Sequence, residues 1–165
     1  AAVQVQNQTI VLSEMLENTT QSLRQTAEAK SVSLNLNIPG ISIETDPGLL
    51  DTIVRNLVAN AIKFSYSGQT VSVAAHVENN FVTVSVSDTG TGMSGETLDN
   101  LFQLDKAKSL PGTANETGTG LGLFLSHEFA VRLGGKIEVS SKENEGSVFS
   151  IVLPLKEENE DNIGN

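Results

Sequence analysis

The chain contains 165 residues, of which 38% are hydrophobic, and this length and composition suit one folded domain with a sizeable core. Its net charge of −10 disfavours a nucleic acid partner, because a phosphate backbone requires a basic surface, although acidic proteins do bind phosphate ligands through backbone N–H groups and metal ions. The absence of cysteine excludes disulfides and thiolate metal sites. No apolar run approaches the roughly 18 residues of a membrane span, so we expect no direct membrane contact.

Taken in chain order, the hydrophobic patterns predict a mixture of helices and strands. Helices are indicated by apolar residues at helical spacing, and strands by alternation between turn residues. The expected elements are a helix over 12–29, strands over 32–38 and 41–45, a helix from Pro47 to a stop at 65–68, strands over 70–77 and 81–88, a short helix over 96–102, a loop over 103–117, a helix from the glycines at 118–122 to about 133, and strands over 136–141 and 147–153. This order predicts an α+β fold: a two-layer α/β sandwich whose mixed, mostly antiparallel sheet is covered on one face by helices.

Local signals support several of these boundaries. Ser13 can cap the first helix, and Asp46 followed by Pro47 is typical of an N-cap and first helical position. Asn79 and Asn80 indicate a hairpin turn between two alternating runs.

The helix that starts at Pro47 carries a polar row opposite its apolar face. Asn56, Asn60 and Lys63 are separated by four and three positions, so they line one side. Such a row can simply be solvated. Alternatively, an amide oxygen can bind Mg²⁺ and the ammonium can meet phosphates, and the row alone leaves both interpretations open.

A second motif, D-T-G-T-G-M, covers residues 88–93 directly after a predicted strand. It places a carboxylate at the end of the strand, and Gly90 and Gly92 permit the backbone to come close to a ligand. A plain Asp-Gly turn explains the same residues, so this motif does not decide by itself between a structural and a binding role.

A third motif, G-T-G-L-G-L, covers residues 118–123 and opens a predicted helix. Free N–H groups at a glycine-rich helix start, together with the helix dipole, favour phosphate. The motif is neither a dinucleotide fingerprint, since no βαβ unit surrounds it, nor a P-loop, since no Gly-Lys-Ser/Thr is present.

In combination, five segments resemble the ATP-binding catalytic domain of sensor histidine kinases. Residues 56–64, 88–93, 101–102, 118–123 and 146–154 are similar, in this order, to the N, G1, F, G2 and G3 boxes of that family. The family belongs to a wider group of ATPases that includes gyrase and a heat-shock chaperone. The resemblance covers roughly residues 12–155 and implies ATP and Mg²⁺ as ligands, with an ATP lid between the F and G2 boxes.

The resemblance also implies roles for the matching residues. Asn60 would hold Mg²⁺, and Asn56 and Lys63 would be catalytic, with Lys63 on the phosphates. Asp88 would accept a hydrogen bond from the adenine amino group, which distinguishes adenine from guanine because guanine presents a carbonyl oxygen there. The remaining residues expected around the nucleotide are Phe64, Gly90, Gly92, Met93, Gly118, Thr119, Gly120, Leu121, Gly122 and Ser147.

Two positions depart from the family pattern. The F box is reduced to Leu101 and Phe102, without an arginine, so Lys106 or Lys108 is a candidate for contact with the γ-phosphate, with a solvated lysine as the alternative. Asn144 occupies a position in the G3 region where glycine is common.

The two histidines do not match a phosphoacceptor. His127 lies in a Ser-His-Glu-Phe sequence, but this sequence follows the G2 glycines and lacks the expected continuation. His76 falls in a strand pattern, where surface or core packing explains it. We therefore expect the acceptor histidine to lie outside this chain.

The resemblance implies a domain organisation and partners. We expect residues 1–11 to be the end of a linker from a missing dimerisation and phosphoacceptor helix bundle, 12–155 to be the ATP-binding domain, and 156–165 to be an acidic disordered tail. The expected partners are that helix bundle and a response regulator receiver domain. The full-length protein would be a homodimer, and this domain would be cytoplasmic even where the full-length protein is anchored to the inner membrane.

Three other functions remain open. A gyrase-like or chaperone-like ATP hydrolase would need a Glu at the place of Asn56 to activate water, and an amide has no useful basicity. A serine kinase that controls a sigma factor has the same fold. A degenerate domain would bind nucleotide or a partner without catalysis.

Overall fold

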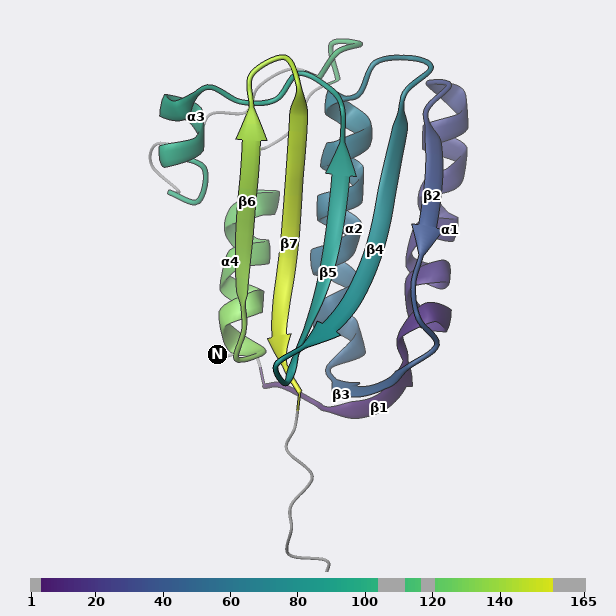
Figure 1. The fold of residues 1–165 in the computed structure, drawn as a ribbon, viewed down its shortest axis with the longest axis vertical. Coiled ribbons are helices and arrows are strands. Elements are labelled where there is room, and N and C mark those ends of the chain that lie inside the picture. Colours follow the sequence, from purple (N-terminus) through teal and green to yellow (C-terminus); the bar gives the residue numbers. More distant parts are fainter. Residues whose placement is uncertain (1–3, 104–111, 117–120, 156–165) are drawn as a thin grey trace, which may run out of the picture.

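The computed structural model describes residues 4–103, 112–116 and 121–155, which form a β-sheet with a row of helices on one face (Figure 1). In spatial order the sheet contains β2 (Ser33–Asn37), β4 (Thr70–Glu78), β5 (Phe81–Asp88), β7 (Gly146–Pro154) and β6 (Lys136–Lys142). β2 and β4 are parallel, and the other neighbouring pairs are antiparallel. The predicted two-layer sandwich with a mixed, mostly antiparallel sheet is confirmed.

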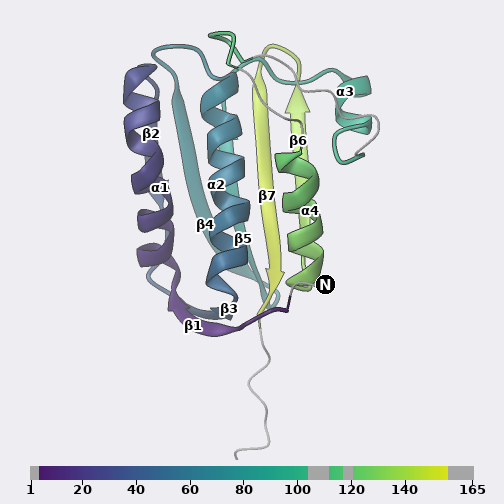
Figure 2. The same ribbon diagram turned by 180° about the vertical axis from the view of Figure 1, so that it is seen from behind.

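The helical layer consists of α1 (Leu12–Ala29), α2 (Pro47–Phe64) and α4 (Gly122–Arg132), with α2 in the middle (Figure 2). The short helix α3 (Gly95–Asp99) stands apart from this row. Among the helices of the described residues, none combines the length and apolar character needed to cross a bilayer.

The core lies between α2 and the sheet. On α2, Leu50, Ile53, Val54 and Leu57 have no exposed surface. Alternate residues of β4 and β5 complete the contact, and these buried side chains are Val71, Val73, Val82, Val84 and Val86. Because the apolar stripe of α2 faces the sheet, its row of Asn56, Asn60 and Lys63 is left on the other side of the helix, where all three are half-buried.

The start of α2 and the turn between β4 and β5 are formed by the residues predicted for them. The Asp46 side chain accepts a hydrogen bond from the Leu49 N–H at 3.1 Å and so caps α2, with Pro47 at its start. Asn79 and Asn80 have φ angles of 51° and 62°, which are typical of the two-residue turn of a tight hairpin.

Two details differ from the sequence predictions. Ser13 does not cap α1: the N-cap is Val11, without a side-chain hydrogen bond, and the Leu12 N–H donates to Ile41 O at 2.9 Å instead. A strand not predicted from the sequence, β1 (Gln8–Val11), pairs antiparallel with β3 (Ser42–Thr45). Four residues are too few to show an alternating pattern, and the strand that they pair with lies far along the chain. The sequence alone therefore does not indicate this strand.

Candidate nucleotide-binding site

The N and G1 motifs meet at one end of the molecule, the upper end in Figure 2. The C-terminal ends of α2 and β5 lie there, together with the described turn at 112–116, and α4 begins on the same side, beside Asn56 in the middle of α2. The Thr91 N–H donates to Phe64 O at 3.1 Å, which joins the turn after β5 to the end of α2. The N and G1 segments, far apart in sequence, therefore lie side by side, and Gly122, in the described part of the G2 segment, contacts Asn56 of the N segment.

Asp88 is the buried acid of this region. It is the last residue of β5, its exposed fraction is 8%, and its Oδ1 accepts the Gly90 N–H at 3.0 Å. Burial raises the pKa of the Asp88 carboxyl, and the N–H groups of Gly90 and Ser147 partly offset this effect. A carboxylate offers about four acceptor sites, so two backbone donors leave capacity for a further donor such as an amino group.

The glycines after Asp88 are required by backbone packing. A Cβ on Gly90 would lie 1.9 Å from Phe64 O, and a Cβ on Gly92, whose φ is +61°, would lie 2.0 Å from Lys142 O. The turn is thus held between the end of α2 and the β6–β7 connection. The expectation that these glycines also admit the base remains a prediction.

Hydroxyl groups connect the next part of this turn to β6 and β7. The Met93 N–H donates to Ser141 Oγ at 2.9 Å, and Ser141 Oγ lies 2.8 Å from Ser147 Oγ. Ser147 pairs with Asp88 across β5 and β7. Ser147 therefore lies beside Asp88, and Met93 is linked to it through Ser141; both were expected around the nucleotide.

Asn56 contacts the first turns of α4. Its Nδ2 donates to Ser126 Oγ at 3.2 Å and lies 3.4 Å from Gly122 O. Ser126 has no exposed surface. Because the amide nitrogen is held against α4, the amide oxygen points away from these two acceptors, which makes it available to a ligand or to solvent.

The end of α2 carries two of the expected ligand contacts. The Lys63 ammonium lies 5.1 Å from the centroid of the Phe64 ring, and both side chains are half-buried. Asn60 lies one turn earlier on the same face. Within the described residues no three His, Asp or Glu side chains cluster as a metal site. An amide beside a phosphate site nevertheless fits Mg²⁺, which keeps several waters and takes few protein ligands when phosphates complete its shell.

Several predicted residues lie outside the described residues, namely Lys106, Lys108, Gly118, Thr119 and Gly120. Leu121, the N-cap of α4, is 43% exposed, and a Cβ on Gly122 would lie 3.8 Å from Asn56 Cγ.

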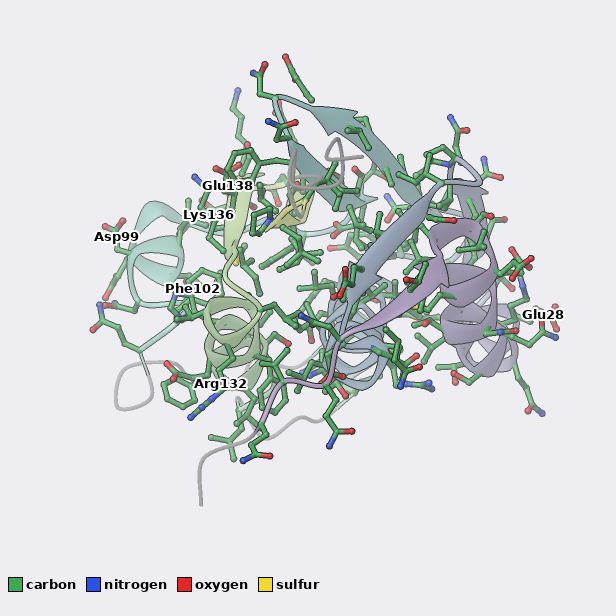
Figure 3. The ribbon with its side chains drawn as sticks, turned by 90° about the horizontal axis from the view of Figure 1, so that it is seen from below. Glu28, Asp99, Phe102, Arg132, Lys136 and Glu138 are labelled. Carbon is green, nitrogen blue, oxygen red and sulfur yellow. The ribbon has the colours of Figure 1, made fainter. Side chains whose placement is uncertain are left out.

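The F-box phenylalanine packs between two elements. Figure 3 shows Phe102 between α3 and α4, with its ring centroid 5.2 Å from that of His127. His127 therefore has a packing contact on α4, while His76 lies exposed in β4.

Four residues that the motifs did not indicate also shape this end of the molecule: Lys30, Thr113, Glu116 and Ser126. The loop predicted over 103–117 carries little apolar pattern. Its part at 112–116 is held instead by polar contacts, since Thr113 N–H donates to Lys63 O at 3.1 Å. Hydrophobic periodicity carries no signal for such contacts.

Comparisons with known proteins agree with this arrangement. Residues 45–157 match the family model described as histidine kinase-, DNA gyrase B-, and HSP90-like ATPase. The sensor histidine kinase GacS of Pseudomonas protegens is 36% identical over 157 residues, which cover 91% of this chain and 17% of GacS. The catalytic domain of histidine kinase ThkA matches with a TM-score of 0.78 and 22% identity, over 91% of this chain and 96% of that chain. Full-length ShkA in complex with AMPPNP matches with a TM-score of 0.79 and 24% identity, over 94% of this chain and 32% of that chain.

The two kinds of comparison carry different weight. At identities of 22% and 24%, the solved structures show the fold alone. GacS is a far longer protein, of which this chain spans only 17%. The family model, by contrast, covers most of the chain, including the segments around Asn56, Asp88 and Gly122. This chain therefore belongs to the family of histidine kinase-, DNA gyrase B- and HSP90-like ATPases.

Proposed function

We propose that this chain is the ATP-binding catalytic domain of a sensor histidine kinase. It binds Mg·ATP and presents the γ-phosphoryl group to a histidine on a separate helix bundle of the full-length protein. The bond from the γ-phosphorus to its bridging oxygen breaks, a phosphorus–nitrogen bond forms, and ADP leaves. The relatives with this name and the AMPPNP complex of ShkA support the proposal.

The observation that carries the proposal is the amide at position 56. Asn56 lies at the place where the gyrase-like and chaperone-like relatives use a carboxylate to activate water. Its Nδ2 donates to Ser126 Oγ at 3.2 Å, and an amide cannot accept a proton from water at neutral pH. The site is therefore suited to holding ATP without hydrolysing it, until an acceptor nucleophile arrives.

The other residues of the site bind and orient. Asp88 accepts a hydrogen bond from the adenine amino group, beside Met93 and Ser147. Lys63, at the end of α2, neutralises phosphate charge, and Asn60 is the protein ligand of Mg²⁺. When bound, the metal ion screens the phosphate oxygens and fixes their geometry. Catalysis by such a site consists mainly of position and electrostatics.

The proposal extends to the longer protein. The helix bundle that carries the acceptor histidine would place its nitrogen in line, about 3–3.5 Å from the γ-phosphorus. A response regulator receiver domain would then take the phosphoryl group on an aspartate. The full-length protein would be a homodimer, with this domain in the cytoplasm.

The proposal is tested with radiolabelled ATP. The purified chain is incubated alone, and then with a helix bundle from the same full-length protein that carries the acceptor histidine. We expect no label on the chain alone and acid-labile label on the bundle. Steady release of inorganic phosphate by the chain alone, without label on the bundle, would instead support a hydrolase.

A matched variant controls for the histidine in α4. His127→Gln removes the imidazole that packs on Phe102 and should leave transfer to the bundle in place, because this ring is engaged on α4 at 5.2 Å from Phe102. Label that appears on the chain alone and disappears in His127→Gln would show that His127 is a phosphoacceptor. Label on a serine of a partner would favour the serine kinase instead.

A further inference from the structure

A half-buried lysine outside the family boxes holds the end of α2. Lys30, the C-cap of α1, keeps only 13% of its side chain exposed. Its Nζ donates to Ile62 O at 3.0 Å and to Lys63 O at 2.8 Å. These carbonyls belong to the last turn of α2, where carbonyls lack partners within the helix and where a cation is favoured by the helix dipole.

The third donor of the same ammonium reaches the turn at 112–116. Lys30 Nζ lies 2.7 Å from Glu116 Oε2. An ammonium has three N–H donors, so Ile62 O, Lys63 O and Glu116 satisfy all of them. Partial burial opposes ionisation of Glu116, but the hydrogen bonds from Lys30 and from the Ala114 N–H outweigh it, and the pKa of this carboxyl lies below its ordinary value.

The turn at 112–116 is attached to α2 by further contacts. The Thr113 N–H donates to Lys63 O at 3.1 Å, and the Thr113 hydroxyl donates to Ser65 O. The Ala114 N–H donates to Glu116 Oε1 at 2.7 Å, so this carboxylate joins the turn to Lys30. Gly112 lies so close to α2 that a Cβ there would be 2.6 Å from Lys63 O.

These contacts converge on the two residues that end α2. Lys63 O accepts from both Lys30 and Thr113, and Phe64 O accepts from Thr91. The carbonyl groups of both residues are thus hydrogen-bonded to three other segments, while their side chains remain half-buried at the candidate site. Fixing the backbone that carries these side chains before the ligand arrives reduces the entropy lost on binding.

We propose that Lys30 and Glu116 are positioning residues for nucleotide binding: together they fix the end of α2 and the turn at 112–116, so that Lys63 and Phe64 meet the nucleotide already in place. This inference rests on the proposed function, and neither residue touches the nucleotide itself.

The test compares nucleotide affinity and local order in four variants of the chain: Lys30→Met, Lys30→Arg, Glu116→Gln and the double variant. Affinity for AMPPNP with Mg²⁺ is measured by calorimetry. Couplings of this kind amount to roughly 5–150-fold in affinity, and we expect about tenfold weaker binding in Lys30→Met. The double variant should be no weaker than Lys30→Met, because both changes break one interaction. Lys30→Arg should restore most of the affinity, since it keeps a cation at the carbonyls.

Amide hydrogen exchange without nucleotide provides the second measurement. The Thr113 and Ala114 amides should exchange faster in Lys30→Met and in Glu116→Gln than in the parent chain. Arg24→Met is the matched control, because it removes a cation from the same helix whose partner, Glu17, lies on that helix at 3.2 Å. It should change neither measurement.

Two outcomes would overturn the inference, and they can be told apart from failure of the proposed function. If the parent chain binds AMPPNP and Lys30→Met binds it equally well, Lys30 has only a structural role. If exchange at Thr113 and Ala114 is unchanged, the turn is held by other contacts. If the parent chain does not bind AMPPNP, the proposed function fails and the positioning role fails with it. Should Lys30→Met not fold, Glu116→Gln decides the question, because Glu116 is only half-buried, with 34% of its side chain exposed, and the change keeps its shape.

Discussion

The replacement Asp88→Asn tests the candidate site most directly, because it changes one atom type and preserves shape. In the parent chain, Asp88 Oδ1 accepts the Gly90 N–H at 3.0 Å. An asparagine would keep this hydrogen bond with its amide oxygen. Its NH₂ group would then take the place of the other carboxylate oxygen and present a donor to the adenine amino group.

The size of the effect follows from the burial of Asp88, which is only 8% exposed. Water therefore cannot easily reach the two donors that would face each other in the variant, which are the NH₂ group of the asparagine and the amino group of adenine. An imperfectly satisfied buried polar pair costs about 1–3 kcal/mol. With 1.4 kcal/mol for each factor of ten, ATP should bind about 5–150-fold more weakly. GTP should lose less or gain, because its carbonyl oxygen can accept from the new NH₂ group.

Calorimetry with both nucleotides measures the change, and thermal unfolding measures the stability of each variant. The amide removes the buried charge, but its NH₂ group is only a donor and the carboxylate accepts N–H groups from both Gly90 and Ser147, so the stability of the variant is measured separately from its affinity. Asp99→Asn, which removes an exposed carboxylate on α3, is the control and should bind ATP normally. An unchanged ratio of ATP to GTP affinity in Asp88→Asn would refute the adenine role of Asp88.

The pH dependence gives this site a second signature. Because burial raises the pKa of Asp88 above its ordinary 3.8, ATP affinity should fall as the pH drops through the raised pKa and the acceptor is lost. Stability changes in the opposite direction. Between the ordinary and the raised value the folded chain holds more protons than the unfolded chain, so the contribution of Asp88 to stability decreases as the pH rises.

Two further replacements test the metal ligand and the packing of the G1 turn. Asn60→Ala should weaken Mg·ATP far more than metal-free ADP, as measured by calorimetry with and without chelator, and equal losses would mean that Asn60 acts by packing. Gly90→Ala should lower the free energy of unfolding by about 1–3 kcal/mol, because its Cβ would lie 1.9 Å from Phe64 O. Gly122→Ala, with Asn56 Cγ at 3.8 Å as its nearest contact, should be tolerated in the same denaturation experiment, and a similar loss for both would contradict the packing argument.

The short-range features of this fold were predictable because each is decided within a few residues. The apolar stripe of α2, its cap by Asp46 and the turn at Asn79 and Asn80 depend on helical periodicity, one side-chain hydrogen bond and a local φ preference. The five boxes were recognisable for a similar reason, since each is a short segment whose residue types and order survive without knowledge of the contacts between them.

What the tertiary structure decided are the contacts between segments that are distant in the chain. β1 exists because residues 8–11 find β3, which begins more than thirty positions later, and Gly90 is required by the backbone of Phe64 rather than by its own turn. Lys30 resembles an ordinary solvated lysine in the sequence. Its acceptors are 32, 33 and 86 positions away, so only the folded chain brings them to one ammonium. Sequence patterns show which residues share a face of one helix or strand. A site built from several elements depends instead on how those faces pack against one another, and this packing is determined by the whole core.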